Sequence, residues 1–296
     1  MAEITASMVM ALRGKTDAPM MDCKKALIEA EGDAQRAEEI LRVRFGNKAS
    51  KASSRIAAEG VVSSFISSDG KSGSLIEINS ETDFCAKNEE FQKFAISLAQ
   101  AVVENKPSTI EDLAQINLDG QTIEELRTGL IGKIGENITP RRFNLLEAKG
   151  SLYSYIHGAK IGVILDLEGG NDMLGKDIAM HIAAAKPKAI DQTGVDAVLI
   201  ETERRVAIEK AKEAGKPDEI LEKIATGTVN KFLKEITLLN QAFVKDDKVS
   251  IQDLLSKNNA TIHSFSMYSV GEGIEKKQED FAAEVAAASK LSLIHI

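Results

Sequence analysis

The sequence predicts an α+β protein made of several compact units. Three observations lead to this class: helical periodicity over the first 46 residues, two similar hairpin-then-helix patterns in the middle of the chain, and helical periodicity again from residue 195. The chain has 296 residues and a hydrophobic content of 43%, enough for more than one buried core. We therefore expect an N-terminal helical module, a duplicated hairpin-plus-helix core, an inserted helical hairpin and a C-terminal helix.

The first unit, residues 1–46, is predicted to be a three-helix module. Its apolar residues recur three and four positions apart, which places them on one face of each helix. The second helix begins near Met20 and ends before Gly32, and Asp33 is positioned to cap the third helix. The Lys-, Ser- and Ala-rich segment 47–55 is typical of a linker to the next unit.

The next unit, residues 56–148, is predicted to be the first core subdomain. A strand that ends near Ile66 is followed by Asp69-Gly70, a strong hairpin signal, and by a returning strand over residues 73–78. After a short loop comes a helix whose apolar residues recur at helical spacing over positions 91–102. This order of elements predicts a small sheet with one helix packed on it.

The hairpin-and-helix pattern occurs a second time later in the chain. The matching segments are Gly60–Ile66 with Gly150–Ile156, Gly73–Ile78 with Gly162–Leu167, and Phe94–Ala99 with Ala179–Ala184. We interpret the second pattern as another core subdomain, formed by residues 149–194 and 232–270, and expect helix 122–134 and strand 141–148 to join the two copies. A two-copy match in one sequence can also arise by chance, so the duplication is a hypothesis.

Residues 195–231 are predicted to form an antiparallel helical hairpin inserted into the second subdomain. One amphipathic helix extends to Ala214, the segment Gly215-Lys216-Pro217 breaks it, and a second helix follows. Strand-like sequence resumes over residues 261–270. The hairpin therefore interrupts the subdomain rather than ending it.

The C-terminal module, residues 271–290, is expected to contain an Ala-rich helix over Glu279–Lys290. Residues Leu291–Ile296 are apolar and β-prone and carry no charge, which makes an unusual end for a soluble factor. We interpret them as a non-native appendage without function. The alternative is a genuine extension that packs on the core.

Charge and aromatic content argue against a dedicated nucleic-acid binder. The net charge is −8, aromatic residues make up 4% of the chain, and Trp is absent. A basic run over residues 36–55 has a simple interpretation as a solvated helix face. The alternative is an RNA- or ribosome-associated module, which a gel shift with RNA at physiological salt would detect.

Cysteine usage and the N-terminal sequence favour the cytoplasm. Cys23 and Cys85 are the two cysteines, and their wide spacing is not that of a disulfide framework. The chain contains no apolar run of the ~20 residues that span a membrane, and its first residues lack the pattern of a signal or transit peptide. We therefore expect a cytoplasmic protein that does not meet a membrane.

Catalytic and metal-site spacings are absent from the sequence. Gly14-Lys15-Thr16 resembles part of a phosphate loop, but Val9 stands where that loop needs a glycine. The four histidines do not have metal-ligand spacing. An enzyme that uses Cys85 or His157 is the alternative, with no constellation to support it. We predict a binding protein with no catalytic residues, no metal and no cofactor.

Two features indicate surfaces for a protein partner. Met20-Met21 places a surplus thioether on a helix whose core face needs only one, although ordinary core packing is the simpler interpretation. Phe84 follows acidic residues in the loop Asn79–Phe84 and could enter a crevice of a partner as an exposed wedge. Considered alone, a phenylalanine at this position is expected in the core.

Several motifs in one order resemble the elongation factor Ts family, whose members are guanine-nucleotide exchange factors of bacterial translation. The motifs are Thr16–Leu27 with Glu31–Asp33, Thr82–Phe84, Lys133–Ile138, Tyr155–Gly158, Met180–Ala184, Phe243–Val244 and Val270–Glu275. The resemblance covers residues 2–290. So many motifs in the order of the family make it highly specific.

The resemblance implies elongation factor Tu as the partner. It implies that a UBA-like N-terminal module docks on the G domain of that partner and that the core contacts the G domain and a distal domain, without direct contact to nucleic acid. It implies that the helical hairpin can dimerise in some members, giving a homodimer or a two-to-two complex. The residues that match family contact positions are Arg13, Met20, Met21, Asp83, Phe84, His157 and Val244.

The resemblance also implies a mechanism that uses the motif Thr82-Asp83-Phe84. Phe84 would wedge apart helices of the partner and Asp83 would disturb its magnesium site, so that GDP leaves and GTP rebinds. Three residues depart from the family pattern: Pro19, Cys85 and Lys245. We expect these departures to change local contacts only.

Overall fold

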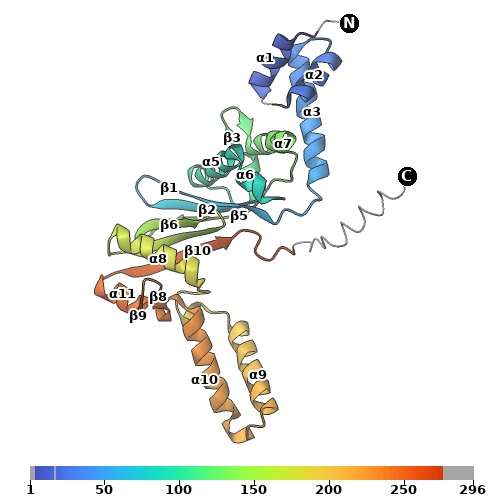
Figure 1. Cartoon of the computed structure of the whole chain (residues 1–296). Helices are drawn as coiled ribbons and strands as arrows, with labels where there is room; N and C mark the ends of the chain where they lie inside the picture. The colour runs from blue at the N-terminus through green and yellow to red at the C-terminus, as the bar shows by residue number, and fades with distance from the viewer. Residues whose placement is uncertain (1–3, 17, 276–296) are drawn as a thin grey trace, which may run out of the picture.

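The computed structural model describes residues 4–16 and 18–275 of the chain and has the α+β fold that the sequence predicts. The molecule is elongated, with an N-terminal helical module at one end, two small sheets in the middle and a helical hairpin at the other end (Figure 1). The predicted helix Glu279–Lys290 and the tail Leu291–Ile296 lie outside the described residues. Within the described residues, none of the helices has the length and apolar character needed to cross a membrane.

Three helices form the N-terminal module: α1 (Ala6–Thr16), α2 (Met20–Glu29) and α3 (Ala34–Ala52). Their own small core contains Leu12, Leu27 and Leu41, all almost fully buried. The predicted N-cap is confirmed, because the Asp33 carboxylate accepts a hydrogen bond of 2.9 Å from the backbone N–H of Arg36.

Helix α3 is longer than the sequence predicts, and the expected linker 47–55 is wrong in most of its length. The helix continues to Ala52 because Ala49 and Ala52 are buried against the first sheet subdomain. Lys48, Ser50 and Lys51 lie on the exposed face of the same helix. Their polar composition is the reason that the sequence predicted a linker here. Tertiary packing therefore decides where this helix ends.

The first subdomain has a three-stranded antiparallel sheet, in which β2 is central. Its strands are β1 (Glu59–Ile66), β2 (Ser72–Ser80) and β5 (Thr139–Glu147), in the order β1-β2-β5. Its helices are α4 (Asp83–Ala86), α5 (Glu89–Asn105), α6 (Ile110–Gln115) and α7 (Ile123–Ile134), and a two-stranded ribbon pairs β3 (Asn117–Leu118) with β4 (Gln121–Thr122). Strand β5 belongs to this sheet, so the segment expected to join the two copies completes the first one.

The second subdomain has a sheet of the same plan. Its strands are β6 (Ser151–His157), β7 (Ile161–Glu168) and β10 (Thr261–Ser269), in the order β10-β7-β6. Helix α8 (Asp172–Ala185) packs on β6 and β7. Further along the chain lie β8 (Ala242–Phe243), β9 (Asp246–Ser250) and α11 (Ile251–Lys257), which the sequence analysis did not identify.

The two sheets pack face to face through reciprocal contacts. Val62 and Leu75 of the first sheet form one apolar cluster with Leu152 and Ile164 of the second. A Cβ on Gly162 would lie 2.3 Å from Val62, and a Cβ on Gly73 of the first sheet would lie 2.7 Å from Leu152 and Ile164. Glycines at matching positions therefore let the two sheets approach each other closely.

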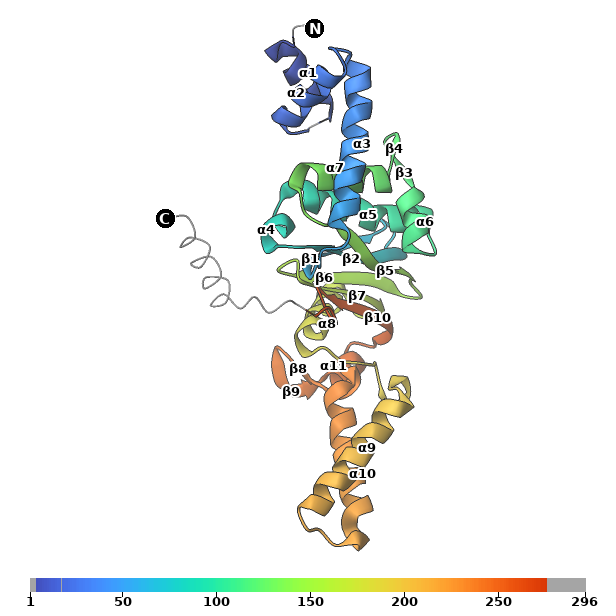
Figure 2. The same cartoon turned by 90° about the vertical axis from the view of Figure 1, so that its right-hand side faces the viewer.

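The inserted helical hairpin projects away from the sheets (Figures 1 and 2). It consists of α9 (Ala197–Glu213) and α10 (Asp218–Ile236). Helix α10 extends past the expected end of the hairpin at residue 231, and its last residues lead into the buried side chains of Thr237 and Leu238. The base of the hairpin is therefore anchored in the second subdomain.

Candidate partner-binding surface

The motif Thr82-Asp83-Phe84 lies between β2 and α5, at the start of the one-turn helix α4. Thr82 is its N-cap, and its hydroxyl oxygen accepts a hydrogen bond of 3.2 Å from the backbone N–H of Cys85. Phe84 is 79% exposed, so the expectation from its residue type alone, a place in the core, is wrong. One turn of helix directs Cys85 and Ala86 into the core, and Phe84 faces the solvent.

Asp83 lies beside Phe84 and shares a cation with it. Its carboxylate accepts a hydrogen bond of 2.7 Å from the Lys87 ammonium, and this bond lowers the pKa of Asp83. The same ammonium lies 5.8 Å from the centroid of the Phe84 ring. The motif thus presents an aromatic side chain and a carboxylate that is ionised at neutral pH.

A carboxylate from another loop holds the beginning of this motif. Glu136, just after α7, accepts hydrogen bonds from the backbone N–H of Thr82 at 2.9 Å and from its hydroxyl at 2.6 Å. Reasoning from the residues gave Glu136 no role, although it lies inside the Lys133–Ile138 motif that carried the family resemblance. Only the fold brings the two loops together.

Cys85 is unsuited to nucleophilic catalysis. Its side chain is buried, burial raises the pKa of the thiol to about 12, and the nearby Glu136 carboxylate adds to the rise. A thiol with such a pKa is almost entirely protonated at neutral pH. The enzyme alternative that relied on Cys85 therefore has no support from its environment.

The two methionines and Arg13 lie on the surface of the N-terminal module. Met20 is 48% exposed and Met21 is 61% exposed, so the simpler interpretation of this pair, ordinary core packing, is wrong. Ala18, which is fully buried just before α2, belongs to the core of the module instead. Both thioethers are available to a partner, and Arg13 is exposed on α1.

His157 and Val244 lie on the second subdomain. His157 ends β6 and is exposed, with its Nδ1 atom 3.2 Å from the Tyr155 hydroxyl. Val244 is exposed in the turn between β8 and β9. Its neighbour Lys245 forms an ion pair of 2.7 Å with Asp177 of α8.

His181 is a core histidine that supports the Val244 turn. It is 1% exposed, its Nδ1 atom accepts a hydrogen bond of 3.2 Å from the backbone N–H of Val244, and its Nε2 atom lies 3.1 Å from Gln241 Oε1. Burial lowers its pKa, which keeps the ring neutral. In residues 4–16 and 18–275, no three or more His, Cys, Asp or Glu side chains are grouped so that they could hold a metal ion.

Several elements that carry predicted contact residues lie along one side of the molecule (Figure 2). Figure 2 shows α2, α4 and the β8–β9 turn projecting to the same side, the left of that view. The turn after His157 lies close to α4. Lys160 in this turn pairs with Glu59 of β1 at 2.7 Å, and the charge of Lys160 helps to lower the pKa of Asp83 in α4. Along this side, α4, which contains Asp83 and Phe84, lies between α2 and the β8–β9 turn.

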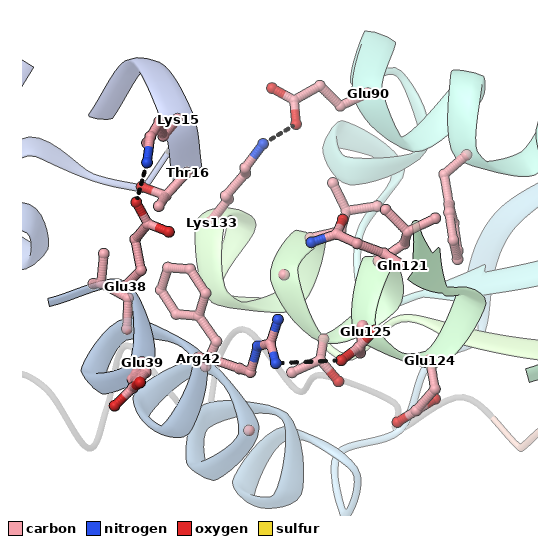
Figure 3. Close-up of a pocket in the computed structure, with 18 of the residues that line it drawn as sticks. Lys15, Thr16, Glu38, Glu39, Arg42, Glu90, Gln121, Glu124, Glu125 and Lys133 are labelled. Carbon is pink, nitrogen blue, oxygen red and sulfur yellow. Dashed lines mark hydrogen bonds and ion pairs between the residues drawn. The ribbon is translucent and has the colours of Figure 1, made fainter. Parts of the chain in front are cut away.

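A separate cleft of about 850 Å³ lies between α3 and α7 (Figure 3). Six of its charged side chains form pairs of opposite sign across it: Lys15 with Glu38, Arg42 with Glu125 and Lys133 with Glu90, at 2.8, 3.7 and 2.9 Å. The predicted contact residues do not line this cleft. Because charges of both signs lie in the cleft, its charge pattern does not favour an anionic or a cationic ligand.

The basic run over residues 36–55, most of it on α3, is largely neutralised by acidic neighbours. The ion pairs are Arg36 with Glu39, Arg42 with Glu125, Arg44 with Glu29, Lys48 with Asp22, and Arg55 with Glu81. A phosphate backbone would have to compete with these carboxylates. This pairing disfavours the RNA-binding alternative, which the gel shift tests.

Comparisons with known proteins agree with the motif order. A family model described as Elongation factor TS matches residues 81–272. The chain is 68% identical over 291 residues to Elongation factor Ts of Methylobacillus flagellatus, covering 98% of this chain and 100% of that protein. It is 62% identical over 287 residues to Elongation factor Ts of Azoarcus sp., covering 97% of both chains, and 55% identical over 287 residues to that of Burkholderia thailandensis, again covering 97% of both.

Proposed function

Because this chain belongs to the elongation factor Ts family, we propose that it is a guanine-nucleotide exchange factor for elongation factor Tu. It binds the GDP complex of that partner, promotes release of GDP and allows GTP to rebind during translation elongation in the cytoplasm. It acts by binding and makes or breaks no covalent bond. The observation that carries this proposal is Phe84, an exposed aromatic side chain on a supported one-turn helix beside a carboxylate.

Phe84 is the wedge in this mechanism. An aromatic ring that is left largely in water gains free energy when a partner crevice buries it. The ring enters between helices of the G domain and keeps them apart. Asp83 enters with it and disturbs the environment of the magnesium ion of the partner, so that the phosphate charge of GDP is less compensated and GDP leaves faster.

Exchange then follows from thermodynamic linkage. A factor that binds the nucleotide-free partner more tightly than the GDP complex weakens GDP binding by the same coupling free energy. GTP reverses the coupling and displaces the factor. The differential affinity must come from groups that meet the partner only when its nucleotide site is distorted, and we assign that role to Asp83 and Phe84.

The other contact residues provide affinity along the same face. Arg13, Met20 and Met21 dock the N-terminal module on the G domain, and adaptable thioethers suit such a contact. His157 and Val244 contact the partner from the second subdomain, which reaches its distal domain. The hairpin of α9 and α10 exposes Val198 and Leu199, which are available for a homodimer or a two-to-two complex.

Release of labelled GDP from bacterial elongation factor Tu tests the proposal. Catalytic amounts of the chain should accelerate release, and Phe84→Ala should reduce the acceleration with little loss of thermal stability. If a folded, saturating chain leaves the rate of release unchanged, the proposed function is wrong.

A further inference from the structure

The loop that carries Phe84 needs support that Phe84 itself does not provide. Helix α4 spans only Asp83–Ala86, and a single helical turn is not stable by itself in water. Phe84 is largely exposed and contributes little to packing in the free protein. The position of the wedge must therefore be set by the residues on which α4 begins.

Glu136 supplies the strongest of these contacts. Both of its carboxylate oxygens bind Thr82, one to the backbone N–H at 2.9 Å and the other to the hydroxyl at 2.6 Å. Hydrogen bonds to a charged acceptor are stronger than neutral ones, and two of them on one residue fix its orientation. Since Thr82 is the N-cap of α4, Glu136 fixes the point from which Asp83 and Phe84 project.

A second carboxylate makes the reciprocal contact, from the loop before α4 to the loop after α7. Glu81 accepts a hydrogen bond from the backbone N–H of Asn137 and pairs with Arg55 at 3.1 Å. Arg55 also donates to the Gly135 carbonyl at 2.9 Å, and its own carbonyl accepts a bond of 2.8 Å from the Asn137 side chain. The loop before α4 and the loop after α7 thus hold each other reciprocally, and the segment after α3 joins them.

We propose that Glu136 is a positioning residue for nucleotide exchange: together with Thr82 it holds Phe84 and Asp83 in the inserting position before the partner arrives. This inference rests on the proposed function. A wedge ordered in advance loses less conformational entropy on insertion than one that must be ordered by the partner.

The effect should fall on the rate of exchange more than on affinity. The predicted contact residues of the N-terminal module and the second subdomain make none of the hydrogen bonds of this clasp, which joins Thr82, Glu136, Glu81, Arg55 and Asn137. They supply affinity without it. Loss of the clasp therefore lowers the maximal rate of GDP release, while the concentration of factor at half-maximal rate changes little.

Fluorescence of the free protein tests the positioning directly. The chain contains no Trp, so Phe84→Trp introduces a single reporter at the wedge. Glu136→Ala and, separately, Thr82→Val should lower the fluorescence anisotropy of the residue at position 84, and Thr82→Ser, which keeps the hydroxyl, should retain it. The matched control is Glu124→Ala, which removes a carboxylate within α7 that pairs with Arg127 at 2.6 Å. Equal anisotropy in the Glu136 and Glu124 variants would overturn the proposal.

Exchange kinetics test the link to Phe84. Glu136→Ala should lower the maximal rate of GDP release about tenfold, the equivalent of one charge-assisted hydrogen bond. In a Phe84→Ala background the same change should cost almost nothing, because the wedge that it positions is absent. A merely structural role would give equal losses in both backgrounds, and that result would overturn the proposal.

The two hypotheses fail in different ways. If Phe84→Ala slows exchange but Glu136→Ala does not, the proposed function stands and the clasp has no positioning role. If Phe84→Ala leaves exchange unchanged, the wedge and the clasp both fail. Where Glu136→Ala does not fold, Thr82→Val gives the same comparison, because it removes only one of the two donors to Glu136.

Discussion

The two sheet subdomains share one scaffold and differ in the loop that follows the central strand. In each, a hairpin leads to a helix, and a later strand pairs with the second strand of the hairpin. Helices α5 and α8 both begin at a capping asparagine, Asn88 or Asn171. Both end at a lysine in the left-handed conformation, Lys106 or Lys186, each with φ of 50°. The scaffold is thus repeated down to its helix caps.

The loops between the central strand and that helix are of different lengths. Residues 81–88 separate β2 from α5 and contain α4, whereas residues 169–171 separate β7 from α8. The short loop is closely packed, since a Cβ on Gly169 would lie 2.2 Å from the Asn259 carbonyl oxygen. The same scaffold therefore carries the exposed Phe84, the proposed wedge, in one copy and a tight turn in the other. The comparison teaches that the candidate function lies in the loop and not in the fold.

Buried acids at matching strand positions show a second difference. Glu77 of the first sheet binds Arg141 at 3.1 Å, Arg142 at 2.6 Å and the Gly271 backbone N–H at 2.7 Å. Asp166 of the second sheet accepts hydrogen bonds from the turn before β6, from the backbone N–H groups of residues 149 and 150 at 2.9 and 3.0 Å. The longer side chain of Glu77 ties β2 to β5 and to the segment after β10.

Substitution of these two acids should give the largest difference in stability between the two subdomains. Glu77→Ala should lower the free energy of unfolding by about 3 kcal/mol, because it leaves two arginines without their buried partner. Asp166→Ala should cost about 1–2 kcal/mol, because it frees two backbone donors at a turn. Urea unfolding of both variants measures the difference. Equal losses would show that the Glu77 cluster adds nothing to the shared scaffold.

The glycines at the sheet interface should behave alike in both halves. Gly73→Ala and Gly162→Ala should each lower the free energy of unfolding by about 1–3 kcal/mol, because the added methyl meets side chains of the other sheet. The control is Gly227→Ala in α10, where a Cβ meets no atom within 4 Å, and a gain of about 0.4–1 kcal/mol is expected. If only one of the two interface variants loses stability, the interface is not reciprocal.

Acid should weaken the second subdomain through His181. Its pKa is lowered by burial from the ordinary 6.5, so below that pH the unfolded chain takes up a proton that the folded chain refuses. Stability contributed by the neutral ring is present above this range and is lost as the pH falls, with a slope of up to about 1.4 kcal/mol per pH unit. Unfolding of His181→Gln between pH 5 and about 7.5 should lack this component. The exposed His157→Gln variant should keep it.

The smallest change in stability is expected at the methionines of the N-terminal module. Met20→Ala combined with Met21→Ala should change the free energy of unfolding by less than about 0.5 kcal/mol, because both side chains are exposed. The same variant should bind the isolated G domain of elongation factor Tu more weakly, as a direct titration measures. Unchanged binding would mean that the methionines do not contact the partner, and a large loss of stability would return them to the core.

Local pattern was sufficient to predict most of the scaffold. The Asp69-Gly70 hairpin, helix α5, the Asp33 cap and the α9–α10 hairpin all follow from spacing and turn chemistry within about twenty residues of sequence. The family could also be predicted, because its motifs are linear strings. These features depend on interactions between near neighbours in the chain, which the sequence displays directly.

Tertiary contacts decided which of the candidate contact residues are exposed. The burial of Ala49 and Ala52 set the length of α3, the one-turn helix α4 turned Phe84 outward, and Ala18 rather than Met20 joined the core of the N-terminal module. Glu136 reaches Thr82 across 54 positions of sequence. Whether a side chain is buried, exposed or held depends on residues that only folding brings near, and single-sequence periodicity contains no record of them.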